Sequence, residues 1–370
     1  MTAAATCPPT TTVADIDRDL AGHPEFGDGL AIERRSLGRL RSGLLMLGRR
    51  VPALAQVAPA IALDERALLA MLGDPVLRNA FECDLGQLAR GRPSRATALA
   101  GFLPTVDLST HGPCQGLADP PRSAWPANGP AWALTGIDES IGPIAGRLWQ
   151  LLRAAFPGPD SIAPIRPLEP DLTALRRGAA LLAELLPGVG GTALRHVRMV
   201  GLARDACDDA ARDGAAGDGA GAGRPMRATS GDDGLPGAIF IAPDQLSPPR
   251  TVARLILREG LRLALLELVR CRPLVTAEPP PLAGLPVPWQ AEPWPVDRAL
   301  FALHRYVHQA LFRAASPPPC AVNTPLARAG DLADRLGGSH RHHLTPLGQA
   351  FVQWLTGATA ALRRVQPSPS

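Results

Sequence analysis

The sequence predicts a mainly α protein with a small β element, and three observations support this fold class. Apolar residues recur at three- and four-residue spacing through much of residues 14–204, which is the period of an amphipathic helix. A short apolar, β-branched run at 237–243, bounded by Gly and Pro, is typical of a buried strand. The segment at 250–270 is apolar around most of a helical circumference, so we expect the C-terminal half to be built around it.

Helical segments follow one another along the chain, and Pro and Gly mark their ends. The segment at 64–90 is interrupted near Gly73, which predicts two helices there. Residues 104–131 are rich in Pro and Gly and predict a long loop. The predicted helices lie at 29–51, 64–90, 140–156, 171–186, 250–270, 296–314 and 345–365.

Composition divides the chain into regions. We expect residues 1–13 and 361–370, at the two ends, to be disordered. Residues 205–236 are low in complexity and rich in Gly and Asp. Because they have little apolar surface to bury, they predict a flexible loop. This loop would separate a helical region at 14–204 from a second region at 237–360.

The basic residues exclude some classes of chemistry. The chain has 38 basic residues, all of them arginine, and a formal net charge of +4. Without lysine, a Schiff base and a Walker-type phosphate loop are excluded, since both need a lysine amine. The arginines are spread along the chain, so nucleic acid is not an expected partner.

The sequence favours a cytoplasmic protein. No apolar stretch reaches the roughly 20 residues that a membrane span needs, so a membrane is not an expected partner. The N-terminal residues have neither the basic start nor the apolar run of a secretory signal. The six cysteines are scattered without a C-x-x-C pair, so we expect reduced thiols rather than a zinc ribbon or a disulfide framework.

The helix predicted at 250–270 contains a motif with altered residues. In H-E-x-x-H, two histidines one helical turn apart bind a metal, and a glutamate lies beside them. Here Glu259 is present, but Arg258 and Arg262 stand at the histidine positions. Arginine stays protonated in proteins and is no metal ligand, although its guanidinium can bind a carboxylate or a phosphate. Together with Arg254, the two arginines form a stripe at four-residue steps, and from this window alone an ordinary solvated helix face is the better explanation.

The order of elements after residue 237 carries a resemblance. An apolar strand precedes the altered motif, Pro288-Trp289 follows it, and a helix with Tyr306 and, two residues on, His308 comes next. This order resembles the HExxH-motif peptide-modification family, over about residues 237–355. Members of that family are described as iron- and 2-oxoglutarate-dependent peptide β-hydroxylases that act on ribosomally made peptides. The resemblance implies a catalytic role for Glu259 and a metal-ligand role for the position of His308, with both side chains in one cleft.

The departure from the family pattern determines the function that we expect. A mononuclear iron site of the usual kind needs at least two histidines and a carboxylate, and only Glu259 and His308 match. The chain then resembles a degenerate member, a pseudoenzyme with no cofactor. We expect it to bind a precursor peptide or a partner enzyme of a ribosomal peptide pathway. The residues expected to contact that ligand are Arg258, Arg262, Trp289 and Tyr306.

Two alternatives remain open. His304 and His308 share one helix face and, with Glu259, would make a two-histidine, one-carboxylate set. The chain would then be an active peptide hydroxylase with a relocated site that uses Fe(II) and 2-oxoglutarate. The other alternative is a purely structural interaction protein, in which the cleft of the family has filled in.

Overall fold

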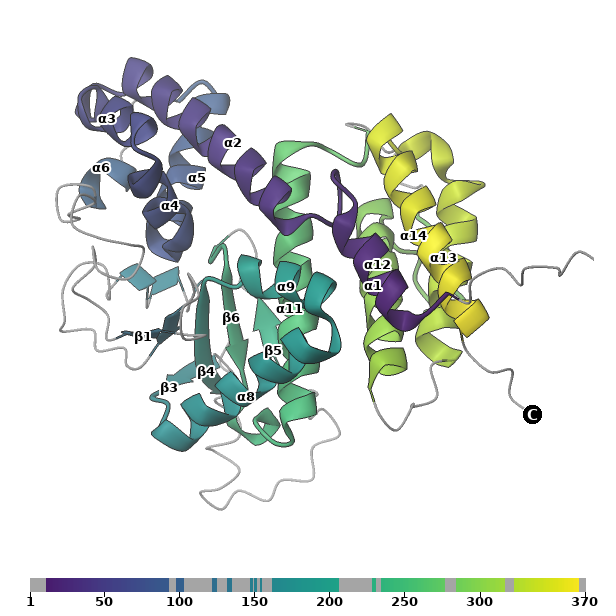
Figure 1. Cartoon of the computed structure of the whole chain (residues 1–370). Helices are drawn as coiled ribbons and strands as arrows, with labels where there is room; N and C mark the ends of the chain where they lie inside the picture. The colour runs from purple at the N-terminus through teal and green to yellow at the C-terminus, as the bar shows by residue number, and fades with distance from the viewer. Residues whose placement is uncertain are drawn as a thin grey trace, which may run out of the picture. The chain divides into compact units, whose positions relative to one another are not determined.

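The computed structural model confirms the predicted fold class, mainly helical with a small β element (Figure 1). The chain separates into two compact units, each made of several segments. Unit 1 consists of Met1–Asp28, Ala183–Gly191 and Arg272–Ser370, and unit 2 consists of Gly29–Leu182 and Thr192–Cys271. The structure describes residues 11–92, 98–102, 122–124, 132–134, 147–148, 150–151, 154, 162–205, 228–230, 234–276, 284–316 and 323–365.

Unit 2 contains a mixed sheet of short strands. Its order is β1-β2-β4-β6-β5, and β3 pairs with β4. The contacts of β4 with β2 and with β6 are parallel, and the other contacts are antiparallel. The strands are β1 (Arg122–Ala124), β2 (Trp132–Leu134), β3 (Ile162–Ile165), β4 (Met199–Asp205), β5 (Ala228–Ser230) and β6 (Ala238–Ile241).

Helices account for most of unit 2. Asp64 and Asp74 begin two consecutive helices, each accepting hydrogen bonds from two backbone N–H groups of the first turn. Apolar side chains of these helices and of the sheet form one buried core that includes Leu44, Phe81 and Phe240. The helices are α2 (Gly29–Arg50), α3 (Val57–Leu63), α4 (Glu65–Gly73), α5 (Pro75–Ala89), α6 (Ala98–Phe102), α8 (Glu169–Leu185), α9 (Pro187–His196) and α11 (Pro249–Cys271); α8 and α9 contribute residues to both units.

The helix α11 is central to unit 2, as its apolar sequence predicts. It packs against α2 and the strands β5 and β6, and most of its side chains are buried. One close approach depends on a glycine: a Cβ atom at Gly260 would lie 2.5 Å from the carbonyl oxygen of Ala193 on α9. The lack of a side chain at Gly260 therefore allows these two helices to cross in contact.

Unit 1 is helical. A capping box at Thr12 and Asp15 begins the first helix. The carboxylate of Asp17 accepts hydrogen bonds from the backbone N–H groups of Gly188 and Val189, at 2.8 and 2.9 Å, and so ties the 183–191 segment to this helix. The helices of unit 1 are α1 (Val13–Gly22), α12 (Val296–Ala315), α13 (Asn323–Gly337) and α14 (Pro346–Val365). Among the described helices of either unit, none combines the length and the apolar character required to cross a membrane.

The elements expected from the sequence can be compared with those observed. The strand at 237–243 and the helices at 250–270 and 296–314 are confirmed as β6, α11 and α12. The sequence predicted no strand within 14–204, but β1, β2, β3 and most of β4 lie there, and β1 falls inside the loop predicted at 104–131. Strand β5 likewise falls inside the flexible loop predicted at 205–236. Strands of three or four residues are too short to show an alternating pattern in the sequence. α13 was not predicted. α14 confirms the helix predicted at 345–365, and because it continues to Val365, the disorder expected from residue 361 is wrong for 361–365. Most of the loops predicted at 104–131 and 205–236, most of the helix predicted at 140–156, and most of the two end segments expected to be disordered lie outside the described residues.

Candidate functional site

The altered motif on α11 is an ion pair. The Nε and Nη2 atoms of Arg258 each lie 2.5 Å from Oε1 of Glu259. The Glu259 side chain is buried at 5% exposure, whereas that of Arg258 is 28% exposed. Arg254 and Arg262 are half-buried like Arg258, so the stripe is not a fully solvated face. The carboxylate that a metal site would need is already bound to a guanidinium.

Replacing Glu259 tests how much the Arg258–Glu259 ion pair contributes to the free energy of unfolding. We expect Glu259→Gln to lower the free energy of unfolding by about 1–3 kcal/mol, because a half-buried guanidinium loses its anionic partner. This loss is smaller than for a fully buried ion pair, because water reaches the Arg258 guanidinium. The measurement is urea denaturation, with Glu184→Gln as the control, because Glu184 is an exposed carboxylate on α8. Equal effects of the two substitutions would contradict a stabilising pair.

The two histidines of α12 lie together in the interior of unit 1. His304 is 5% exposed and His308 is 3% exposed, and their ring centroids are 4.3 Å apart. The Nδ1 atom of His308 lies 2.8 Å from the carbonyl oxygen of His304. Because a carbonyl oxygen only accepts, Nδ1 of His308 carries the proton and Nε2 keeps its lone pair. The rings of Phe351 and Trp354 on α14 contact this pair.

Burial keeps both imidazoles neutral. Desolvation lowers the pKa of His304 well below its ordinary value, and the neighbouring His308 lowers it further. Desolvation likewise lowers the pKa of His308 to about 4, although the hydrogen bond to the His304 carbonyl opposes this change. Neutral imidazoles are the form that binds metal ions.

The residues present do not fit the iron site that the resemblance implies. Within either unit, the described residues include no group of three His, Cys, Asp or Glu side chains that could hold a metal ion. Glu259 belongs to unit 2, whereas His304 and His308 belong to unit 1, so neither unit holds the relocated set. The expected approach of Glu259 to His308 remains a prediction.

The two aromatic residues expected to contact a ligand lie side by side in unit 1. The rings of Trp289 and Tyr306 are 6.2 Å apart and nearly perpendicular. The guanidinium of Arg328 lies 5.1 Å from the Trp289 ring and 5.7 Å from the Tyr306 ring, within the range of cation–π contacts. Trp289 is partly exposed, and its buried Nε1 has no hydrogen-bond partner among the described residues. We call Trp289, Tyr306 and Arg328 the aromatic site.

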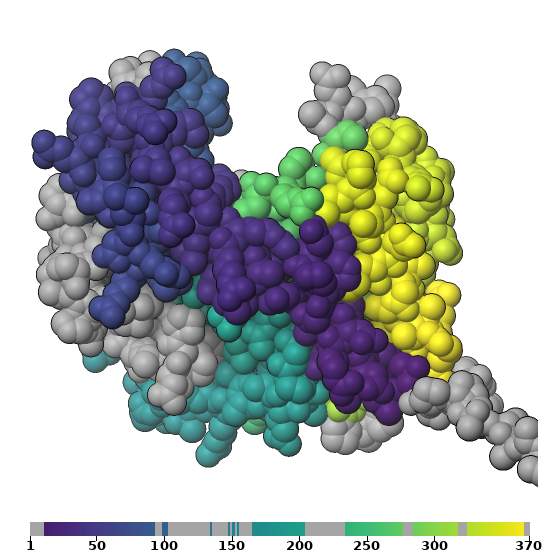
Figure 2. Space-filling view, turned by 45° about the horizontal axis from the view of Figure 1, so that its top comes forward, coloured from purple at the N-terminus to yellow at the C-terminus, as the bar shows by residue number. Residues whose placement is uncertain are grey.

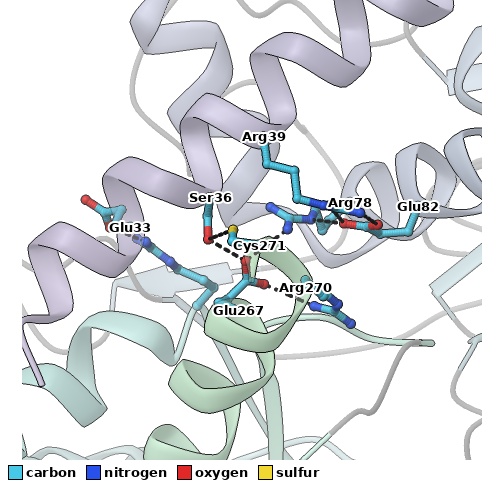
Figure 3. Close-up of polar contacts among 9 residues, drawn as sticks. Glu33, Ser36, Arg39, Arg78, Glu82, Glu267, Arg270 and Cys271 are labelled. Atoms are coloured by element: carbon cyan, nitrogen blue, oxygen red, sulfur yellow. Dashed lines mark hydrogen bonds and ion pairs between the residues drawn. The ribbon is translucent and has the colours of Figure 1, made fainter. Parts of the chain in front are cut away.

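Sequence reasoning missed a buried ionic cluster in unit 2, drawn in Figure 3. It joins α2, α5 and α11 through Ser36, Arg39, Arg78, Glu82, Glu267, Arg270 and Cys271. The Arg78 side chain, 1% exposed, donates from Nε to Glu82 and from Nη2 to Glu267, at 2.9 Å each. Burial acts to raise the pKa of Glu267, but the guanidinium groups of Arg78 and Arg270 outweigh it and lower this pKa to about 2.

A small pocket adjoins the ionic cluster. Nδ1 of His196 lies 2.9 Å from the carbonyl oxygen of Thr192, and its buried Nε2 has no hydrogen-bond partner among the described residues. Burial lowers the pKa of His196, so Nε2 offers a lone pair. This geometry could accept a hydrogen bond from a small donor. The pocket is lined by Glu33, Ser36, Leu72, His196, Arg198, Pro236, Gly237, Leu263 and Glu267.

Comparison with known proteins adds no family to this description. No model of a known protein family matches the sequence, and no curated protein matches it significantly. The similarity to the HExxH-motif family therefore depends only on the order of elements between residues 237 and 355.

Proposed function

We propose that this chain is a degenerate HExxH-type protein that binds a precursor peptide or a partner enzyme of a ribosomal peptide pathway in the cytoplasm. Arg258 and Arg262 replace the two motif histidines, and the protein does no metal chemistry of the family type there. In unit 1 the ligand contacts Trp289 and Tyr306 of the aromatic site. Contacts with Arg258 and Arg262 on α11, in unit 2, stay a prediction from the resemblance.

The observation that carries the proposal is the ion pair of Arg258 with Glu259. In a metal site this glutamate would lie beside two neutral histidines and be free to act on a bound water. Here its carboxylate oxygen Oε1 instead lies 2.5 Å from the Arg258 guanidinium, so the side chain is engaged by a neighbouring cation. The motif position is therefore suited to charge pairing rather than to metal-assisted catalysis.

The aromatic site supports a role in peptide binding. Partly exposed tryptophan and arginine side chains are enriched where proteins bind other chains. Proline rings pack well on perpendicular aromatic rings, and Arg328 can pair with a carboxylate of the bound segment. A proline-rich acidic peptide therefore has the chemistry that this site would recognise.

Metal content separates the proposal from an active hydroxylase. We expect the untagged protein to purify without stoichiometric iron, zinc or manganese, measured by mass spectrometry of the metals. The variant with Arg258→His and Arg262→His should take up measurable iron if His308 completes the ligand set. One equivalent of metal in the unaltered protein, lost in His304→Ala or His308→Ala, would establish the relocated site instead.

Peptide binding separates the proposal from a structural protein. The probe is a fluorescent peptide of about ten residues in which Glu and Pro alternate, followed by anisotropy. Binding that is lost in Trp289→Ala and in Arg328→Met, but kept in Arg364→Met on the exposed side of α14, supports the aromatic site. The proposal of peptide binding fails if the probe does not bind or if all three variants bind it equally.

A further inference from the structure

The aromatic site of unit 1 includes a short closed loop. Leu285 and Trp294 exchange two backbone hydrogen bonds, of 2.7 and 2.8 Å, which close the loop between them. Trp289 lies in this loop, and its ring centroid is 6.1 Å from that of Trp294 and 6.2 Å from that of Tyr306. Three prolines inside the loop restrict its backbone further, so little conformational freedom is lost when a ligand binds here.

Two exposed arginines of α12 extend the aromatic site. The guanidinium carbon of Arg298 lies 4.7 Å from the centre of the Trp294 ring, and that of Arg305 lies 4.9 Å from the centre of the Tyr306 ring. Both distances are within the range of cation–π contacts. Among the described residues, no carboxylate forms an ion pair with either arginine. Both guanidinium groups therefore keep N–H groups that can bind a carboxylate of a ligand.

The helical period places both arginines on one side of α12. Arg298 and Arg305 are seven residues apart, which is almost two full turns. They therefore differ by only about 20° around the helix, and their Cα atoms by about 10.5 Å along it. The partly exposed ring of Trp289 lies next to both of the rings, Trp294 and Tyr306, that these guanidinium groups cover. One aromatic surface thus has a cation at each end.

We propose that Arg298 and Arg305 bind two carboxylates, three residues apart, of a proline-rich peptide whose proline rings pack on Trp289. This inference rests on the peptide binding proposed for the aromatic site, and it adds the spacing of the acidic residues. A polyproline II chain makes one turn every three residues, so side chains at positions i and i+3 share one edge and lie about 9.3 Å apart. This distance is close to the spacing of the two arginines, whose long, flexible side chains can accommodate the difference.

A single-stranded nucleic acid fits this surface less well. Such ligands need several exposed aromatic rings on which successive bases stack. Trp294 is 4% exposed and Tyr306 is 6% exposed, so of these three rings only that of Trp289 offers a base an accessible face. A proline-rich chain needs one such ring for its proline side chains. It is also extended before it binds, and therefore loses little conformational freedom.

The test compares two fluorescent proline-rich peptides of about nine residues that have the same composition, each with two glutamates. In the first peptide the glutamates are three residues apart. In the second they are two residues apart, which places them on different edges of a polyproline II helix. We expect the first peptide to bind about fivefold more tightly in fluorescence anisotropy at about 50 mM NaCl, because it forms one more exposed ion pair.

Arginine variants show whether the preference comes from these two residues. Arg298→Met and Arg305→Met should each bring the ratio of the two dissociation constants from about five to near one, because a single guanidinium then remains for either peptide. A purely structural role of the arginines would weaken both peptides alike and leave the ratio unchanged. The control Arg364→Met changes an exposed arginine of α14, a helix whose side chains lie at the surface (yellow in Figure 2), and should keep the ratio.

The outcomes separate this inference from the proposed function. Equal binding of both peptides by the unaltered protein, lost in Trp289→Ala, would overturn the spacing inferred here and leave the proposed peptide binding in place. Binding of none of the proline-rich probes would overturn both. The inference also fails if a single-stranded RNA of about nine nucleotides binds more tightly than the first peptide and depends in the same way on Arg298 and Arg305.

Discussion

Replacing Arg78 with methionine should lower the free energy of unfolding by about 3–5 kcal/mol. The arginine is fully buried, and its guanidinium binds the carboxylates of Glu82 and Glu267. Methionine fills much of the same volume but leaves Glu267 with one fewer cation in a buried site. The measurement is urea denaturation at neutral pH, where both carboxylates are charged.

Matched variants of the same cluster check the cause of this loss. Arg39 pairs with Glu82 but is 24% exposed, so Arg39→Met should cost clearly less than Arg78→Met. In the Arg78→Met background, Glu267→Gln should recover part of the stability, because it removes a buried carboxylate that has lost one of its two cationic partners. If Arg78→Met lowers the free energy of unfolding no more than Arg39→Met does, the buried ion pairs of Arg78 do not stabilise the fold as proposed.

The sequence predicted the long helices because their periodicity extends over many residues. α2, α11 and α12 each repeat the pattern over five turns or more, so local ambiguity averages out. The strands β3 and β4 are short, at four and seven residues, and are surrounded by helical sequence. A run of this length does not distinguish a buried strand from a piece of a helix.

The ionic cluster could not be predicted from the sequence. Arg78 and Glu267 are 189 residues apart, and their contact depends on a fold in which α2 packs against both α5 and α11. Arginine is rarely buried, so an amphipathic pattern places Arg78 on the solvent face by default. The apolar residues around it gave no signal of a buried charge.

The candidate site was predictable only in its local parts. The pairing of Glu259 with Arg258 involves adjacent residues, and the sequence contains both. Trp289 and Tyr306 were expected to contact one ligand, and they lie 6.2 Å apart. Arg328 completes the aromatic site from α13, a helix that the sequence analysis did not predict. Its contact with Trp289 was therefore found only in the structure.

Acidification from pH 6.5 to about 4 should destabilise unit 1 by about 3 kcal/mol or more. The imidazole of His308 takes up a proton near pH 6.5 in an unfolded chain but only near pH 4 in the folded one. Between these values the unfolded state binds more protons, so stability falls as the pH falls. One pH unit of difference corresponds to about 1.4 kcal/mol, and His304, whose pKa is also lowered, adds to the effect.

The pH window identifies the groups responsible. Glu267 has a lowered pKa of about 2, so its contribution to stability is present above about pH 4.5 and is lost only below that value. The measurements between pH 7.5 and 4.5 therefore report on the histidines.

The check is urea denaturation at several pH values between 7.5 and 4.5, followed by circular dichroism. The variant His304→Leu, His308→Leu should lose most of the pH dependence in this range, because leucine fills the apolar interior of unit 1 without a group to protonate. A smaller dependence remains from the buried His196 of unit 2, whose pKa is also lowered. The control His342→Ala removes an exposed imidazole and should keep the full dependence. An equally steep loss of stability in the leucine variant would assign the acid sensitivity to other groups and would remove the argument that burial keeps the α12 histidines neutral.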